Sequence, residues 1–138
     1  MSPAIEDVHN LMECAQGKIR ANPTVYAGCT QSAVLLGKVF DKLGIPWERK
    51  FGQVTTIRGE RIHHCWLETN DIVIETNPSQ ILGIDKGALG IGKELWQRLT
   101  RPREETQILP RVEPTEAGHR FYDREADQIL QCYRGKVA

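Results

Sequence analysis

Apolar side chains recur at steps of three and four residues in two N-terminal segments, 4–20 and 29–43. This spacing puts them on one face of an α-helix and predicts a helix in each segment. The second segment has a wide apolar surface, which indicates burial on more than one side, and Gly44 followed by Pro46 marks its end. The apolar positions that define the two faces are Ile5, Val8, Leu11, Met12, Ala15 and Ile19, and then Ala33, Leu36, Val39, Phe40 and Leu43.

From residue 47 onward the pattern changes to one typical of β-strands. Segments 51–57, 62–68 and 72–75 are rich in residues that favour strands, and short polar turns separate them. Turns of this length join antiparallel neighbours. The pattern therefore predicts a three-stranded antiparallel meander that directly follows the second helix.

After the third predicted strand the periodic signal weakens. Four glycines interrupt residues 81–93, which we expect to form a loop with at most a short helical turn. A short helix is predicted at 94–99, an extended, proline-containing connection at 100–114, and a last helix at 115–133. Because no repeat or domain boundary is visible, residues 1–138 are expected to form a single α+β domain.

The composition argues against some classes of partner. The chain has 138 residues, 26% of them charged, and a formal net charge of +0, so strong electrostatic binding to nucleic acid or to an anionic membrane is not expected. No apolar run is long enough to span a bilayer, and the acidic N-terminus lacks the apolar stretch of a secretory signal peptide. The expected location is the cytoplasm, or outside the cell by a route that needs no signal peptide.

The four cysteines show no paired metal-binding spacing such as Cys-x-x-Cys. Four cysteines could form two disulfides, but in a chain without a signal peptide free thiols are expected instead. A zinc site built from Cys29, His63, His64 and Cys65 is disfavoured because adjacent ligands on a strand diverge, and no metal or organic cofactor is expected. Cys14 and Cys132 are expected to be structural, and Cys65 is expected to be a thiol in the core.

Cys29 stands at the start of a predicted helix, directly after Gly28. A helix N-terminus favours the thiolate form, which is the nucleophilic one, and its free N–H groups can bind an oxyanion. The competing interpretation is a buried structural cysteine, since free cysteine is often buried.

His64 is the predicted base for this thiol. Side chains alternate along a strand, so His64 shares a face with Trp66, whereas His63 and Cys65 point the other way. Only one of the two histidines can therefore meet Cys29.

Glu75 is the predicted partner of His64. Pairing through the turn at 69–71 sets Glu75 across from about Trp66, where its carboxylate can accept the Nδ1–H of the imidazole. Asn77 is the rival for this orienting role. Trp66 is expected to line the site, and Gln53 and Tyr26 are candidate oxyanion donors or lining residues.

Three sequence blocks resemble the transglutaminase-like branch of the papain-like cysteine enzymes. The chain has Gly28-Cys29-Thr30-Gln31-Ser32-Ala33 with Leu43-Gly44-Ile45-Pro46, then His64-Cys65-Trp66-Leu67-Glu68, then Ile72-Val73-Ile74-Glu75. They resemble the family's Cys-helix, its His-x-Trp strand and its Asp-bearing strand, except that Glu75 stands where the family usually has Asp. The resemblance covers about residues 26–80 and leaves 81–138 unassigned.

This resemblance implies that Cys29, His64 and Glu75 act as nucleophile, base and orienting acid on a protein or peptide substrate. The thiol would attack a peptide or carboxamide carbonyl to form a thioester. Hydrolysis is favoured, as in a protease, an amidase or a protein deamidase, including a toxin or effector, because a small domain has little surface for two substrates. The alternatives are transglutaminase-type transamidation and a catalytically silent protein-binding module on the same fold.

Overall fold

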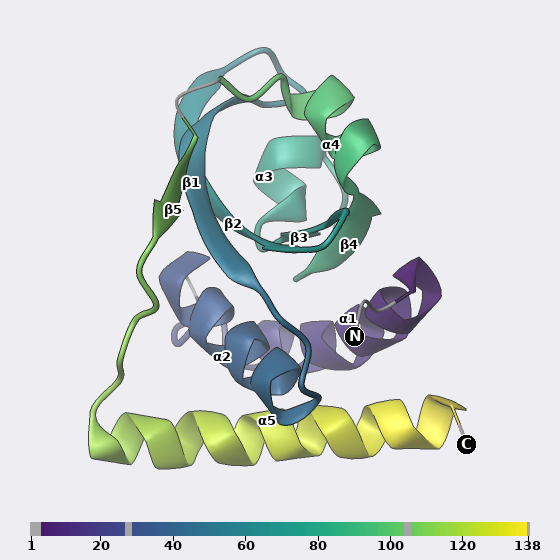
Figure 1. Cartoon of the computed structure of the whole chain (residues 1–138), viewed down its shortest axis with the longest axis vertical. Coiled ribbons are helices and arrows are strands. Elements are labelled where there is room, and N and C mark those ends of the chain that lie inside the picture. Colours follow the sequence, from purple (N-terminus) through teal and green to yellow (C-terminus); the bar gives the residue numbers. More distant parts are fainter. Residues whose placement is uncertain (1–3, 27–28, 104–105, 138) are drawn as a thin grey trace.

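The computed structural model describes residues 4–26, 29–103 and 106–137, with the side chain of Cys29 outside the described part. Within these residues the chain forms five helices and one five-stranded antiparallel sheet, an α+β fold (Figure 1). The elements in chain order are α1 Ile5–Ala21, α2 Cys29–Lys42, β1 Glu48–Thr55, β2 Arg61–Thr69, β3 Ile72–Glu75, α3 Pro78–Leu82, β4 Leu89–Gly92, α4 Lys93–Thr100, β5 Gln107–Leu109 and α5 Glu116–Val137.

The predicted meander is present as β1, β2 and β3, paired antiparallel in that order. Helices α1, α2 and α4 lie within a residue or two of the predicted segments, and α5 continues four residues beyond position 133, to Val137. The turn between β2 and β3 uses Asn70 with a φ of 54°, a left-handed conformation that asparagine tolerates better than most residues.

Two strands were not predicted. The sheet order is β4-β3-β2-β1-β5, so β4 and β5 extend the meander at both edges. β4 was expected to be loop because two of its four residues are glycines. A Cβ on one of them, Gly90, would lie 2.5 Å from Val8 Cγ1, so the glycine lets α1 approach the strand closely.

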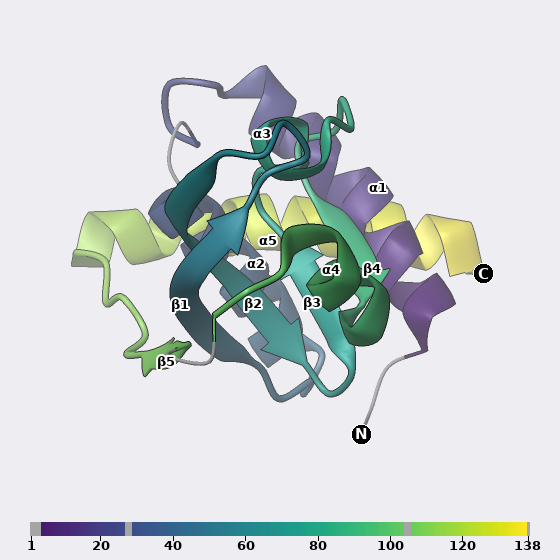
Figure 2. The ribbon, with the colours of Figure 1, turned by 90° about the horizontal axis from the view of Figure 1, so that it is seen from above.

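The sheet divides the helices into two groups. Helices α1, α2 and α5 lie together outside the curve of the sheet, whereas α3 and α4 lie inside it (Figures 1 and 2). We call the sheet face that carries Cys65, Leu67 and Ile74 the outer face, and the one that carries His64 and Trp66 the inner face.

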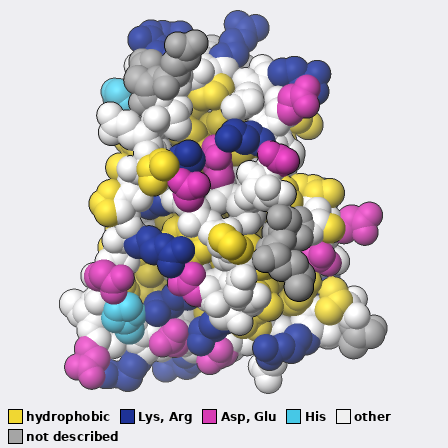
Figure 3. All heavy atoms as spheres, viewed as in Figure 1, with side chains coloured by type: hydrophobic (Ala, Val, Ile, Leu, Met, Phe, Trp, Pro, Cys, Tyr) yellow, Lys and Arg dark blue, Asp and Glu magenta, His cyan; other side chains and the backbone are white. Residues whose placement is uncertain are grey.

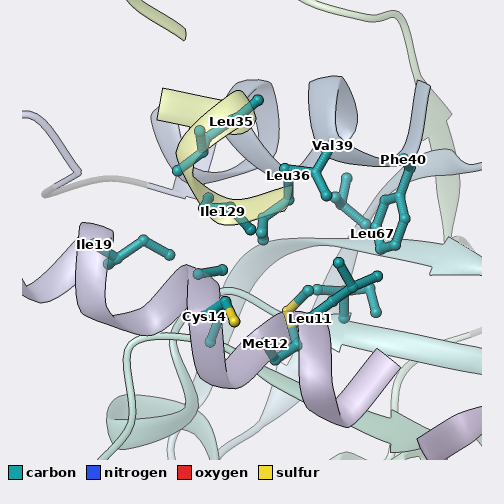
Figure 4. Packing of buried hydrophobic residues seen from close by; sticks show 14 of the residues in the cluster. Leu11, Met12, Cys14, Ile19, Leu35, Leu36, Val39, Phe40, Leu67 and Ile129 are labelled. Carbon is teal, nitrogen blue, oxygen red and sulfur yellow. The ribbon is translucent and has the colours of Figure 1, made fainter. Parts of the chain in front are cut away.

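Each face has its own hydrophobic cluster. On the outer face, Leu67 packs with residues of α1, α2 and α5, among them Leu36 and Ile129 (Figure 4). On the inner face, Trp66 packs with Trp96 of α4 and with residues of α3. The core therefore has two layers, and the strand β2 contributes side chains to both.

A disulfide joins Cys14 of α1 to Cys132 of α5, with a Cα–Cα distance of 5.8 Å. The expectation of free thiols is therefore wrong for this pair, and also for Cys65, which is disulfide-bonded rather than a core thiol. Sequence spacing did not reveal the first bond because its cysteines are 118 positions apart and meet only when the two helices pack. Among the described helices, none is long and apolar enough to span a bilayer.

Candidate active site around His64 and Glu75

The central contact of the inner face is between the imidazole of His64 and the carboxylate of Glu75. Nε2 of His64 lies 2.6 Å from Oε1 of Glu75, and the two residues are 6% and 0% exposed. Glu75 follows Ile74, which pairs with Leu67, so its place in the ladder is opposite Trp66. The hairpin pairing predicted from the sequence brings these two side chains together in the structure.

The ring nitrogen that makes this contact differs from the expected one. Nε2, rather than Nδ1, donates to Glu75. The more distal nitrogen reaches the neighbouring strand because Glu75 lies two positions along the ladder from His64. Nδ1 makes no hydrogen bond to any described residue, so it is the ring atom left for a thiol or a substrate.

Glu75 is held by two further donors. The backbone N–H of Asn77 donates to Oε1 over 3.0 Å, and the indole N–H of Trp96 donates to Oε2 over 3.0 Å. Both oxygens of a carboxylate that is removed from water are therefore hydrogen-bonded, as such a buried group requires. This fixes the carboxylate, and through it the plane of the His64 ring.

Trp96 was not singled out from the sequence. It lies in α4, 21 positions beyond Glu75, in the segment where no family resemblance was found. The available signal was an aromatic residue with a polar N–H on a short amphipathic helix, because a buried indole N–H usually has a partner. That signal predicts a hydrogen bond but does not identify the acceptor.

The side chain of Asn77 is hydrogen-bonded to Gln80 and not to His64. Its Nδ2 donates to Oε1 of Gln80 over 2.8 Å at the exposed start of α3. Only its backbone N–H points to the site, through Glu75. The contact with His64 therefore comes from Glu75.

Trp66 forms one wall of the site. Its ring lies 6.0 Å from the His64 ring at an interplanar angle of 26°, and 4.5 Å from the ring of Trp96. Its indole N–H donates to Glu68, whose other oxygen is bound by Lys93. These contacts fix the Trp66 ring beside the imidazole of His64.

The helix α2 begins at Cys29, as predicted. In its first turn, the hydroxyl of Thr30 accepts a hydrogen bond of 3.1 Å from Arg49, and the same Arg49 nitrogen lies 3.9 Å from Sγ of Cys65. Arg49 pairs with Leu67 in the ladder and therefore belongs to the outer face. The start of α2 thus contacts the outer face, whereas His64 belongs to the inner face.

His63 also belongs to the outer face. It is exposed, and its ring stacks on Phe51 at 5.6 Å with an interplanar angle of 6°. Its ladder partner is Gln53, which shares that face and is therefore not beside His64. His63, and not His64, therefore lies on the same face of the sheet as Arg49.

Tyr26 lies in the outer cluster and not beside His64. It is 6% exposed, with its ring 6.4 Å from the ring of Tyr122. Burial, together with the charge of Glu125, raises the pKa of Tyr26 far above its usual value. Its hydroxyl has no hydrogen-bond partner among the described residues.

No group of three or more metal-binding side chains occurs in the part of the chain that the structure describes. Comparison of the chain with protein-family models, with curated proteins and with solved structures gives no match.

Proposed function

We propose that this chain is a cysteine-dependent acyl-transfer enzyme with a transglutaminase-like, papain-like fold, acting on a peptide or carboxamide bond. Cys29 is the nucleophile, His64 the base and Glu75 the residue that orients the base. The single observation that carries the proposal is the buried His64–Glu75 hydrogen bond of 2.6 Å. A base held through one ring nitrogen by a fixed carboxylate is the arrangement that a thiol nucleophile needs.

In the reduced protein, the reaction begins when the Cys29 thiol gives its proton to Nδ1 of His64 and the sulfur attacks the substrate carbonyl carbon. Backbone N–H groups at the start of α2 stabilise the oxyanion. The carbon–nitrogen bond then breaks, the imidazolium returns its proton to the leaving ammonia or amine, and a thioester remains. Water attacks this thioester, with His64 as base again, and releases the acid and the thiol. Glu75 stabilises the charged imidazole throughout.

The proposal requires the sulfur of Cys29 to come within hydrogen-bond reach of Nδ1 of His64. Because Thr30 contacts the outer face, His63 is the competing base. The two histidines are adjacent in sequence and point to opposite faces, so single alanine substitutions separate them.

The test is site-resolved labelling with iodoacetamide over a range of pH, read by mass spectrometry on fully reduced protein. Cys14 and Cys132, released from their disulfide, serve as reference thiols. We expect Cys29 to label fastest at neutral pH, below the ordinary thiol pKa of about 8.5. His64→Ala should remove this advantage and His63→Ala should keep it.

Two results would contradict parts of the proposal. If His63→Ala rather than His64→Ala removes the advantage, the base is His63. If Cys29 is no more reactive than the reference thiols, Cys29 is not an activated nucleophile. In an enzyme, Glu75→Gln should lower the labelling rate of Cys29, whereas Asn77→Ala should leave it almost unchanged because the side chain of Asn77 is hydrogen-bonded to Gln80 instead of His64.

The second candidate function is a catalytically silent protein-binding module. It is favoured by the contact of the first turn of α2 with the face opposite His64.

Transamidation is a variant of the first proposal, and a fluorescent alkylamine added with a glutamine-containing peptide distinguishes it from hydrolysis. The Cys14–Cys132 bond supports action in an oxidising compartment, which fits an exported hydrolase or effector.

A further inference from the structure

A pocket of about 80 Å³ lies beside α2, between that helix and the segment that leads into α5. Figure 3 shows side chains of both charges and a histidine gathered at the lower left of the molecule, where Figure 1 draws this segment. Among the residues that line the pocket are Ala33, Lys38, Trp47, Arg49, Arg111 and His119.

Most of the basic groups in this pocket already have an acidic partner. The guanidinium of Arg111 also lies over the ring of Trp47, 4.0 Å from its centroid, which gives the pocket a flat, partly apolar wall. The pairs are Lys38 with Asp123 at 3.3 Å, Arg111 with Asp41 at 3.1 Å and His119 with Glu113 at 3.3 Å.

Arg49 is the exception. No carboxylate of the described residues lies within ion-pair distance of it, and its polar contacts are the hydroxyl of Thr30 and the sulfur of Cys65. Its Nε is buried and has no hydrogen-bond partner among the described residues. Burying a donor of the guanidinium without a hydrogen-bond partner costs free energy of folding. An anion bound in the pocket would offset this cost.

We propose that this pocket binds a carboxylate of the substrate, an Asp or Glu side chain or a chain terminus, with Arg49 as its partner. The inference rests on the proposed function, because Ala33 of the pocket lies one helical turn from Cys29. A carboxylate there would sit within a residue or two of the carbonyl that Cys29 attacks. The substrate class is therefore an acidic peptide.

The pocket suits a carboxylate better than a phosphate. A planar carboxylate matches the fork of donors on a guanidinium. Asp41 and Glu113 also line the pocket, and their charges repel a dianion more strongly than a monoanion. The small volume further limits the ligand to a short side chain.

The first test compares two alkylating reagents of similar size on reduced protein, the anionic iodoacetate and the neutral iodoacetamide. The measured quantity is the ratio of their labelling rates at Cys29. We expect Arg49→Gln to lower this ratio by about tenfold, the factor for one lost charge-assisted hydrogen bond. The control is Arg120→Gln on α5, where Arg120 is exposed and paired with Glu116. An unchanged ratio in Arg49→Gln would overturn the proposal.

The second test does not depend on the reactivity of Cys29. In a Cys29→Ala variant, N-acetylglutamate amide should shift the NMR signals of Ala33 and Thr30, whereas N-acetylglutamine amide should not. Arg49→Gln should abolish these shifts, and Arg49→Lys should weaken them because it removes Nε and the fork. If the carboxylate binds but Cys29 is unreactive, the pocket assignment stands and the enzyme proposal fails. If Cys29 is reactive, but does not prefer iodoacetate to iodoacetamide and the protein does not prefer N-acetylglutamate amide to N-acetylglutamine amide, only the pocket assignment fails. The enzyme proposal then stands.

Discussion

The indole N–H of Trp96 donates a 3.0 Å hydrogen bond to Oε2 of Glu75. The two residues are 1% and 0% exposed, so the bond lies in the interior between α4 and the end of β3. Since the other oxygen of Glu75 accepts from His64, the tail segment that contains α4 is part of the support of the candidate base. Helix α4 thus helps to fix the carboxylate that contacts His64.

Replacing Trp96 with Phe should destabilise the protein by about 1–3 kcal/mol, because Oε2 of Glu75 would remain buried without its donor. The measurement is the free energy of unfolding in urea. A double-mutant cycle with Glu75→Gln isolates the bond, and a coupling energy near zero would show that the loss comes from ring packing alone.

The orientation of the β2 side chains was predictable because it depends only on local alternation. Since Thr69-Asn70-Asp71 formed the predicted turn, Glu75 could be placed opposite Trp66 and close to His64 before the structure was known. The start of α2 at Cys29 was predictable in the same way, from Gly28 and the apolar period that follows. These features depend on neighbours that are close in sequence.

Features that depend on distant parts of the chain were not predictable. The edge strand β5 has three residues, and nothing within it indicates that it pairs with β1. The disulfide joins residues 118 positions apart, and the Trp96–Glu75 hydrogen bond joins residues 21 positions apart. The face of the sheet that α2 covers was also missed, because strand alternation separates the two faces without saying which helices lie on each.

Removing the disulfide by the double substitution Cys14→Ala and Cys132→Ala should lower the free energy of unfolding by about 3–5 kcal/mol. The bond closes a loop of 118 positions, and cross-links that close long loops restrict the unfolded chain most. Urea denaturation of the variant and of the oxidised wild type measures the difference. A difference below about 1 kcal/mol would mean that α1 and α5 hold together by packing alone.

Tyr26 should make the fold sensitive to alkaline pH. Burial, and then the negative charge of Glu125, raise its pKa, so the folded protein holds the phenol proton more tightly than the unfolded chain does. This contribution is fully present below the unfolded pKa of about 10 and is lost as the pH rises above it.

Tyr26→Phe should therefore flatten the loss of stability above pH 10 by up to about 1.4 kcal/mol per pH unit. At pH 7 the change should be close to neutral or slightly stabilising, because it removes a hydroxyl that has no partner among the described residues. The measurement is urea unfolding at pH 7 and at pH 11. A parallel decline in both proteins would show that Tyr26 ionises in the folded state as readily as in the unfolded chain.

Two glycines in neighbouring helices should respond to alanine in opposite directions. A Cβ on Gly37 of α2 would lie 2.4 Å from a ring carbon of Trp47, whereas a Cβ on Gly17 of α1 would meet no atom within 4 Å. Gly17→Ala should stabilise the protein by about 0.5–1 kcal/mol through the better helix propensity of alanine. Gly37→Ala should destabilise it by about 1–3 kcal/mol, because the ring must move.

The ring of Trp47 also packs against the guanidinium of Arg111 and lines the pocket beside α2. Gly37→Ala should therefore weaken the binding of N-acetylglutamate amide to the Cys29→Ala protein, whereas Gly17→Ala should not. Equal stability changes in the two variants would contradict the close packing of α2 against Trp47.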